Sequence, residues 1–318
     1  MRFLHLQQLA LALALAASAN AGNVTLSSAG GRPFAGENGA LLASGALVRI
    51  GTFDLPEATR DATLSATSDY ATLNSWFRPL GESTAATGTV AQANNTTTTN
   101  LRVNAYPAAG HAFGTISDIA SSYIAPGTKL YLWVFNGATP RESTQWGIFC
   151  AGDWQAPPAL GAKSLSTRSA TLQALQGTAA AESLKLKRPA ETFGNWRLRS
   201  FPADASAASL AFDADGDGDG IHNLAEYAWK LNPQHFDRNR ADLLKETAAS
   251  DATFTFKVPV GLTDVQVKAE CSPNLRDWTA AESTITDTDA DFETRTAVSP
   301  SGIERCFWRV RLTAITPP

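Results

Sequence analysis

Acidic residues alternate with glycine between Asp215 and Glu226, in the segment DGDGDGIHNLAE. A calcium ion takes about six to eight oxygen ligands, and a twelve-residue loop supplies them from side chains at positions 1, 3, 5, 9 and 12 and from the carbonyl at position 7. Position 6, where such a loop bends sharply, holds Gly220. The segment therefore predicts a calcium (Ca2+) site whose ligands are Asp215, Asp217, Asp219, the main chain of Ile221, Asn223 and Glu226.

The starting residue of this loop is fixed by the residue at position 12. A loop that began at Asp213 would place Leu224 there, and an alkyl side chain offers no oxygen ligand. A second acidic run, Asp287 to Asp291, has Phe292 in place of the glycine at position 6. We therefore expect a single calcium loop that starts at Asp215, and a polar turn between strands at the second run.

The residues after the loop have the pattern of a short helix. Leu224, Tyr227, Ala228 and Leu231 share one helical face, and Asn232-Pro233 ends the helix. The alternative is an acidic loop that only contacts solvent. We disfavour it because closely spaced aspartates repel each other without a cation.

The stretch from Ala214 to Pro233 (ADGDGDGIHNLAEYAWKLNP) resembles the thrombospondin type 3-like, EF-hand-like calcium loop of secreted bacterial multidomain proteins. The segments VKAECSPNLRDW and ERCFWRVRL resemble strands of the C-terminal β domain that follows this loop, and the likeness covers about 193 to 316. Lys230 replaces the glycine and Asn232 the aspartate at the end of the motif. The resemblance implies a structural calcium module.

The first 21 residues have the features of a signal peptide. Leu4 to Ala17 is apolar, and Ala19-Asn20-Ala21 supplies the small residues that precede cleavage before Gly22. The run is shorter than the roughly 20 residues that cross a bilayer, so we expect no transmembrane segment after its removal. The sequence predicts a secreted, cell-surface or periplasmic protein. The net charge of −4 argues against a nucleic-acid partner.

The pattern of the remaining chain is mainly β. We expect two β-sandwich-like domains joined by the single calcium loop plus one short α-helix, because short alternating runs such as ALVRIGTF and DVQVKAEC recur in both halves. Short helices are expected at Asp69–Phe77 and Ser117–Tyr123. The predicted parts are a signal peptide (1–21), an N-terminal β domain (22–168), a linker (169–200), the calcium loop and helix (201–240) and a small C-terminal β-sandwich (250–318).

The three cysteines are Cys150, Cys271 and Cys306. An odd number leaves at least one thiol unpaired within the chain. The alternatives are a Cys271–Cys306 disulfide, which an exported protein permits, and three buried thiols. The absence of any CxxC or Cys/His cluster argues against zinc.

Catalytic motifs such as HExxH and GxSxG are absent from the sequence. His111 is more typical of a loop histidine than of a base, and nothing in the spacing pairs the carboxylates Asp54, Glu57 and Asp153. Trp133 is expected in the core, and core packing is favoured over sugar binding for Trp76, Trp146 and Trp154.

The predicted function is accordingly an exported calcium-binding structural or interaction protein, in which calcium braces a domain junction. Its partner would be an extracellular glycan or another surface protein. The alternative is a polysaccharide-binding or polysaccharide-degrading protein that uses the N-terminal β domain.

Overall fold

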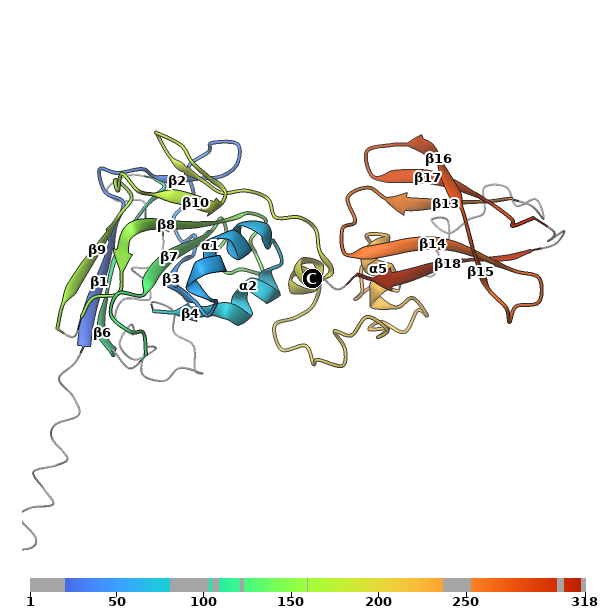
Figure 1. Cartoon of the computed structure of the whole chain (residues 1–318), viewed down its shortest axis with the longest axis horizontal. Coiled ribbons are helices and arrows are strands. Elements are labelled where there is room, and N and C mark those ends of the chain that lie inside the picture. The colour runs from blue at the N-terminus through green and yellow to red at the C-terminus, as the bar shows by residue number, and fades with distance from the viewer. Residues whose placement is uncertain are drawn as a thin grey trace, which may run out of the picture. The chain divides into compact units, whose positions relative to one another are not determined.

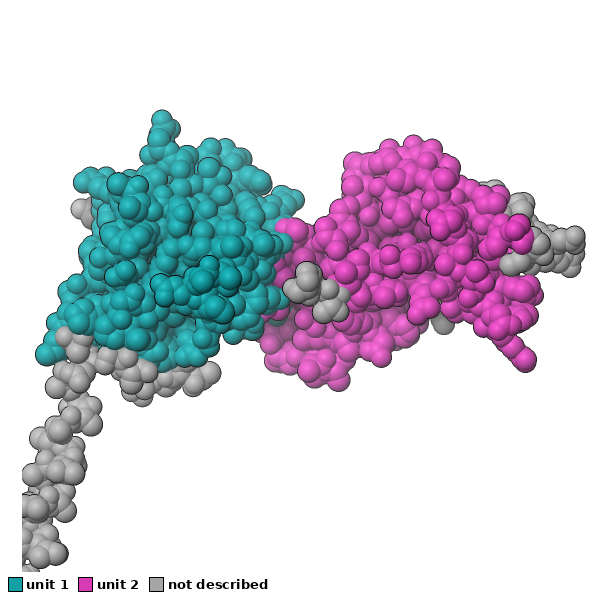
Figure 2. Space-filling view, in the orientation of Figure 1, with its two compact units in different colours: residues 1–68, 72–189 teal, residues 69–71, 190–318 magenta. Residues whose placement is uncertain are grey.

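The computed structural model describes residues 21–80, 103–104, 109–120, 123–158, 160–236, 253–301 and 306–315. The chain divides into two compact units (Figure 2). Unit 1 comprises Met1–Ser68 and Thr72–Pro189, and unit 2 comprises Asp69–Ala71 and Ala190–Pro318. In each unit strand residues far outnumber helical residues, which confirms the mainly β fold class (Figure 1). The predicted signal peptide lies outside the described residues except for Ala21, where the first strand begins.

Unit 1 contains three sheets among its described residues. A four-stranded sheet has the order β5-β6-β1-β9, a five-stranded sheet has the order β10-β8-β7-β3-β4, and a small sheet has the order β11-β12-β2. The bounds are β1 Ala21–Ser27, β2 Phe34–Ala35, β3 Val48–Phe53, β4 Phe77–Pro79, β5 Val103–Asn104, β6 His111–Ala120, β7 Lys129–Phe135, β8 Trp146–Gln155, β9 Ala162–Ser166, β10 Gln173–Gln176, β11 Thr178–Ala179 and β12 Leu184–Lys185.

Alternation along the strands divides the buried side chains of unit 1 into two layers. One layer combines residues of both larger sheets, such as Leu26 and Ile116 from one sheet and Leu132 from the other. The second layer lies on the other face of the five-stranded sheet, where α1 (Glu57–Ala66) and α2 (Tyr70–Trp76) are found. It is an aromatic cluster that consists of Phe53, Phe77, Tyr131, Trp133, Phe135 and Trp146.

The predicted linker at 169–200 differs from what the structure shows. Residues up to Pro189 belong to unit 1, where β10 pairs with β8 and β12 pairs with β2. Gln176 is buried, and its side-chain amide nitrogen Nε2 donates to the main-chain oxygens of Leu64, Ser65 and Thr67 at the end of α1. These strands are two to four residues long. They are too short to show the alternation that identifies a strand in the sequence.

Unit 2 begins with helical segments and continues as two sheets. It contains α4 (Phe193–Ser200), which the sequence did not predict, and α5 (Asn223–Ala228). The two three-stranded sheets have the orders β13-β17-β16 and β15-β14-β18. Their bounds are β13 Thr253–Pro259, β14 Val265–Ser272, β15 Thr279–Ala281, β16 Ser283–Thr288, β17 Phe292–Val298 and β18 Phe307–Ala314.

The core of unit 2 joins its helices to its sheets. Phe254 and Phe256 of β13 and Val265 and Val267 of β14 lie in one apolar cluster with α4 and α5 residues. The sandwich is small, and docking of the two helices therefore adds apolar contacts that the sheets alone lack. No helix in the described part of the chain has the length and apolar character needed to cross a membrane.

Candidate metal centre

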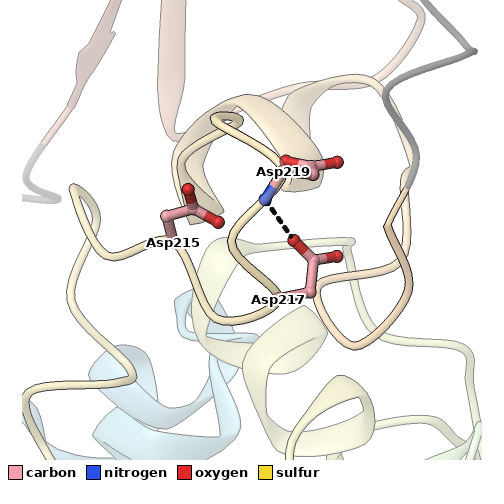
Figure 3. Close-up of side chains that lie close together, drawn as sticks. All are labelled: Asp215, Asp217 and Asp219. Carbon is pink, nitrogen blue, oxygen red and sulfur yellow. Dashed lines mark hydrogen bonds between the residues drawn. The ribbon is translucent and has the colours of Figure 1, made fainter.

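Three of the predicted ligands converge in the structure. Ligand oxygens of Asp215, Asp217 and Asp219 all lie within 4.8 Å of one another, and Figure 3 shows the three side chains on one loop. This group forms because alternate residues of a tightly wound loop project toward its centre. The arrangement provides the hard oxygen donors that a divalent cation such as calcium or magnesium prefers.

Main-chain N–H groups of the loop hold each carboxylate in place. Asp215 accepts from the N–H groups of Gly218 (2.8 Å) and Gly220 (2.9 Å). Asp217 Oδ1 accepts from Asp219 N at 3.1 Å, and Asp219 Oδ1 accepts from Ile221 N at 2.7 Å. Asp217 Oδ2 is buried and has no hydrogen-bond partner among the described residues. That oxygen therefore lacks the compensation that a buried carboxylate oxygen needs.

The loop turns where glycine makes it possible. Gly218 and Gly220 have φ angles of 77° and 89°, in the left-handed region that residues with a Cβ disfavour. An added Cβ would meet no other atom within 4 Å at either position, so the requirement for glycine is conformational and not steric. The predicted role of Gly220 at the bend agrees with this geometry.

Asn223 provides a second buried oxygen without a partner. Its side chain is fully buried, and Nδ2 donates to the carbonyl oxygens of Ser209 (2.9 Å) and Ala211 (2.7 Å). These two bonds fix which end of the amide carries nitrogen, because both partners are acceptors. Oδ1 consequently faces the other way, and it has no hydrogen-bond partner in the described structure. Leaving a buried acceptor unsatisfied costs about 1–3 kcal/mol, and a bound cation would remove that cost.

Glu226 is also fully buried, in the first turn of α5. It is not a member of the 4.8 Å group of aspartates. Oxygens on opposite sides of one calcium ion are separated by about 5 Å, so a ligand at position 12 can fall outside a group of that size. Ile221 contributes only its main chain, because its side chain packs against Ala228, Trp229 and Leu231.

Long-range contacts attach α5 to the rest of unit 2. The Tyr227 hydroxyl lies 2.7 Å from Asp264 Oδ1 and 3.0 Å from the Glu191 carbonyl. Burial and the Asp264 carboxylate raise the pKa of Tyr227 well above its usual range, so this hydroxyl remains a donor. Asp264 Oδ2 also accepts from Phe193 N at 2.6 Å, at the start of α4. Asp264 therefore joins both helices, and no motif in the sequence marked it.

The end of α5 is a Schellman motif in which Lys230 takes the left-handed position. Lys230 has a φ of 57°, its N–H donates to Tyr227 O at 3.2 Å, and Leu231 N donates to Glu226 O at 2.7 Å. The resembling motif has glycine at this position, and the structure shows why glycine suits it. Lys230 also forms an ion pair with Asp291 at 2.7 Å.

The candidate catalytic groups of unit 1 have separate structural roles. His111 Nδ1 lies 2.8 Å from the carbonyl of Ser28, so this nitrogen carries its proton and cannot act as a base toward Ser28 Oγ. Asp54 forms an exposed ion pair with Arg78, and Glu57 lies in the first turn of α1. Asp153 accepts from Ser169 and Thr171 and has a lowered pKa, chiefly because of the hydrogen bond from Ser169.

The tryptophans considered for sugar binding are mostly in the core. Trp133, Trp146 and Trp154 are fully buried, and Trp76 is partly buried at the end of α2. A sugar ring stacks on an exposed aromatic face, so the three buried tryptophans offer it no platform. Trp133, Trp146 and Trp154 therefore do not support the alternative function.

Comparisons with known proteins add no assignment to this geometry. No protein-family model matches the chain, and no curated protein or solved structure matches it.

Proposed function

We propose that this chain is an exported calcium-binding protein in which the ion, held by the loop from Asp215 to Glu226, braces the helical segment of unit 2 against its sandwich. The observation that carries the proposal is the pair of buried oxygens, Asp217 Oδ2 and Asn223 Oδ1, which lack hydrogen-bond partners in the described structure. Both belong to positions that a calcium loop uses as ligands. The junction that is braced lies inside unit 2, between its helices and its sheets.

The donor set favours calcium over the other common divalent cations. All predicted ligands are carboxylate, amide or main-chain oxygens, whereas zinc prefers histidine and cysteine. Magnesium requires a smaller octahedral shell and usually retains several waters. A twelve-residue loop that contributes six protein ligands suits the larger and less rigid shell of calcium. The resemblance to thrombospondin type 3-like loops supports the same choice.

A structural role follows from the way in which the loop closes. Asn223 N donates to Ala214 O at 2.8 Å and Leu224 N donates to Phe212 O at 3.0 Å, so the start and end of the loop are already joined. A cation would neutralise the repulsion between the aspartates inside this closed loop. The same ion would stabilise α5, which carries Tyr227 and its contact with Asp264.

Calorimetry on the purified chain tests the proposal. Extracellular calcium modules have dissociation constants of about 0.1–1 mM, so about 10 mM calcium should add roughly 1.4–2.7 kcal/mol to the stability of unit 2. This corresponds to an increase in melting temperature of roughly 4–10 °C. We expect EGTA to reverse the shift, and magnesium at the same concentration to produce a smaller one.

Two isosteric variants provide the contrast. Asp217→Asn removes a charged ligand and should lose the shift, whereas Asp287→Asn changes the second acidic run and should keep it. Asp287 is exposed, and its Oδ1 accepts only from a neighbouring N–H in the described structure. A wild-type melting temperature that does not respond to calcium would falsify the proposal. An equal response from wild type and Asp217→Asn would show that calcium binds elsewhere.

A further inference from the structure

The outward face of the sheet β15-β14-β18 carries several basic side chains. Burial alternates along β18, so that Arg309 and Arg311 are exposed while Val310 and Leu312 pack toward the core. On β14, Lys268 is exposed between two buried neighbours. The register places Lys268 directly opposite Arg311. We call Lys268, Arg309 and Arg311 the basic face.

This arrangement has an energetic cost for the sheet. Like charges that lie directly opposite on antiparallel strands destabilise the pair. Glu270 offsets part of the repulsion, because it forms ion pairs with Arg309 at 2.6 Å and with Arg311 at 3.4 Å. On this face β14 and β18 nevertheless carry three positive charges and one carboxylate, so these two strands have an excess of positive charge there. A ligand with negative charges would complete the neutralisation.

Glu270 and an aromatic ring also hold the basic face in a defined conformation. Glu270 is only 7% exposed, so it forms a fixed support beneath the arginines. The guanidinium carbon of Arg309 lies 4.0 Å from the centre of the Trp278 ring. Arg309 is thus held between a carboxylate and an indole, while the side chain of Arg311 is 60% exposed and keeps donors free for solvent or ligand. Phe307 is 51% exposed and adds an apolar surface on the same face of β18.

We infer that the basic face binds an acidic polysaccharide, which is a sugar polymer that carries carboxylate or sulfate groups. Guanidinium groups present paired N–H donors that match the oxygens of these anions. The exposed ring of Phe307 offers a surface for the C–H faces of sugar rings. The basic face comprises three side chains, whereas nucleic acids are bound by broadly basic surfaces.

The inference does not depend on the proposed calcium site, because none of these residues lies between Asp215 and Glu226. It also assigns polysaccharide binding to unit 2, whereas the alternative function considered from the sequence used the N-terminal β domain. Binding can therefore be measured with the metal removed, and the Asp217→Asn variant should bind the polysaccharide as the wild type does. A failure of the calcium proposal and a failure of this one are thus separate results.

Isothermal titration of the full chain with polygalacturonate and with heparin tests the inference, with dextran as the neutral probe. The double variant Lys268→Gln/Arg311→Gln should bind both anionic polymers at least about tenfold more weakly, because two charge contacts are lost. The matched variant Lys163→Gln/Arg188→Gln loses the same charge from unit 1 and should stay within about twofold of the wild type. Melting curves establish that each variant folds, and Arg311→Gln alone is the substitute if the double variant does not.

Three results would overturn the inference. The first is the absence of binding by the wild type to either anionic polymer. The second is an equal loss of affinity in both double variants, which would reflect net charge alone. The third is tighter binding to duplex DNA or to phosphatidylserine vesicles than to either polysaccharide, which would assign the face to another class of ligand.

Discussion

Lys230 allows the geometry of the loop module to be tested through its stability. This residue has a φ of 57° at the end of α5, where the resembling motif has glycine. A residue with a Cβ is strained by roughly 1–2 kcal/mol in this conformation. Replacing Lys230 with glycine should relieve the strain, and replacing it with alanine should not.

The comparison between the two variants isolates the backbone effect. Both variants lose the ion pair with Asp291, whose partners have side chains 52% and 64% exposed, and such pairs contribute about 0–1 kcal/mol. Glycine also increases the entropy of the unfolded chain relative to alanine, which costs about 0.4–1 kcal/mol. Subtracting the central value of this cost, about 0.7 kcal/mol, from the central value of the strain, about 1.5 kcal/mol, leaves Lys230→Gly more stable than Lys230→Ala by about 0.8 kcal/mol.

Urea unfolding of the two variants measures this difference, with the transition of unit 2 identified as the one that responds to calcium. Hydrogen exchange of the Leu231 amide gives a local measurement, because its bond to Glu226 O closes the helix end. We expect slower exchange in Lys230→Gly than in Lys230→Ala. The reasoning is refuted if the alanine variant is as stable as the glycine variant and its Leu231 amide is equally protected.

Three further predictions concern other parts of the chain. Gln176→Ala should destabilise unit 1 by about 1–3 kcal/mol, because it leaves carbonyls at the end of α1 without their donor. Urea unfolding measures this loss, and the control Gln173→Ala, at an exposed position of β10, should lower the free energy of unfolding by less. Burial raises the pKa of Glu270, but the hydrogen bonds and charges of Arg309 and Arg311 outweigh it and hold the pKa below its usual value. The lowered pKa stabilises the fold at pH values above the unfolded-state pKa of about 4.3, and this stabilisation is lost as the pH falls through the folded-state pKa. Glu270→Gln should therefore make the free energy of unfolding depend less on pH on the acid side. Cys306 lies beside the Cys271 thiol, and burial together with that thiol raises the pKa of Cys306 to about 12. Because the two sulfurs are neighbours, oxidised glutathione should join them in a disulfide, faster at alkaline pH where more thiolate forms, and peptide mapping that finds each thiol free at alkaline pH would contradict this.

The convergence of the three aspartates at the candidate metal centre was predictable because it is local. Asp215, Asp217 and Asp219 alternate within one loop, and their convergence requires only the bends at Gly218 and Gly220. Asp264 was not predictable, because it meets Tyr227 from 37 positions further along the chain. Its role depends on how the sandwich packs, which no local pattern encodes.

The errors in secondary structure have the same origin. The predicted helix at Asp69–Phe77 is confirmed by α2, whereas the helix predicted at Ser117–Tyr123 is wrong, because β6 continues to Ala120. In this strand Ile116 lies opposite Val24 and Ile119 opposite Gly22, so pairing with β1 overrides the local preference. A strand that is defined by a partner more than ninety residues away is not visible in a short window of sequence.

The length of α5 connects the metal centre to the stability of unit 2. The helix has six residues, which is too few to be stable alone in water. Its beginning contains Asn223 and Glu226 of the candidate metal loop. Its later contacts include the hydrogen bond of Tyr227 with Asp264, and just after the helix Trp229 Nε1 donates to Lys257 O at 3.3 Å. Tertiary contacts therefore fix the second half of the helix, while the first half retains a buried oxygen without a partner among the described residues. Occupation of the loop by a cation would satisfy the first half, and for this reason we expect metal binding and the docking of α5 on the sandwich to be one cooperative event.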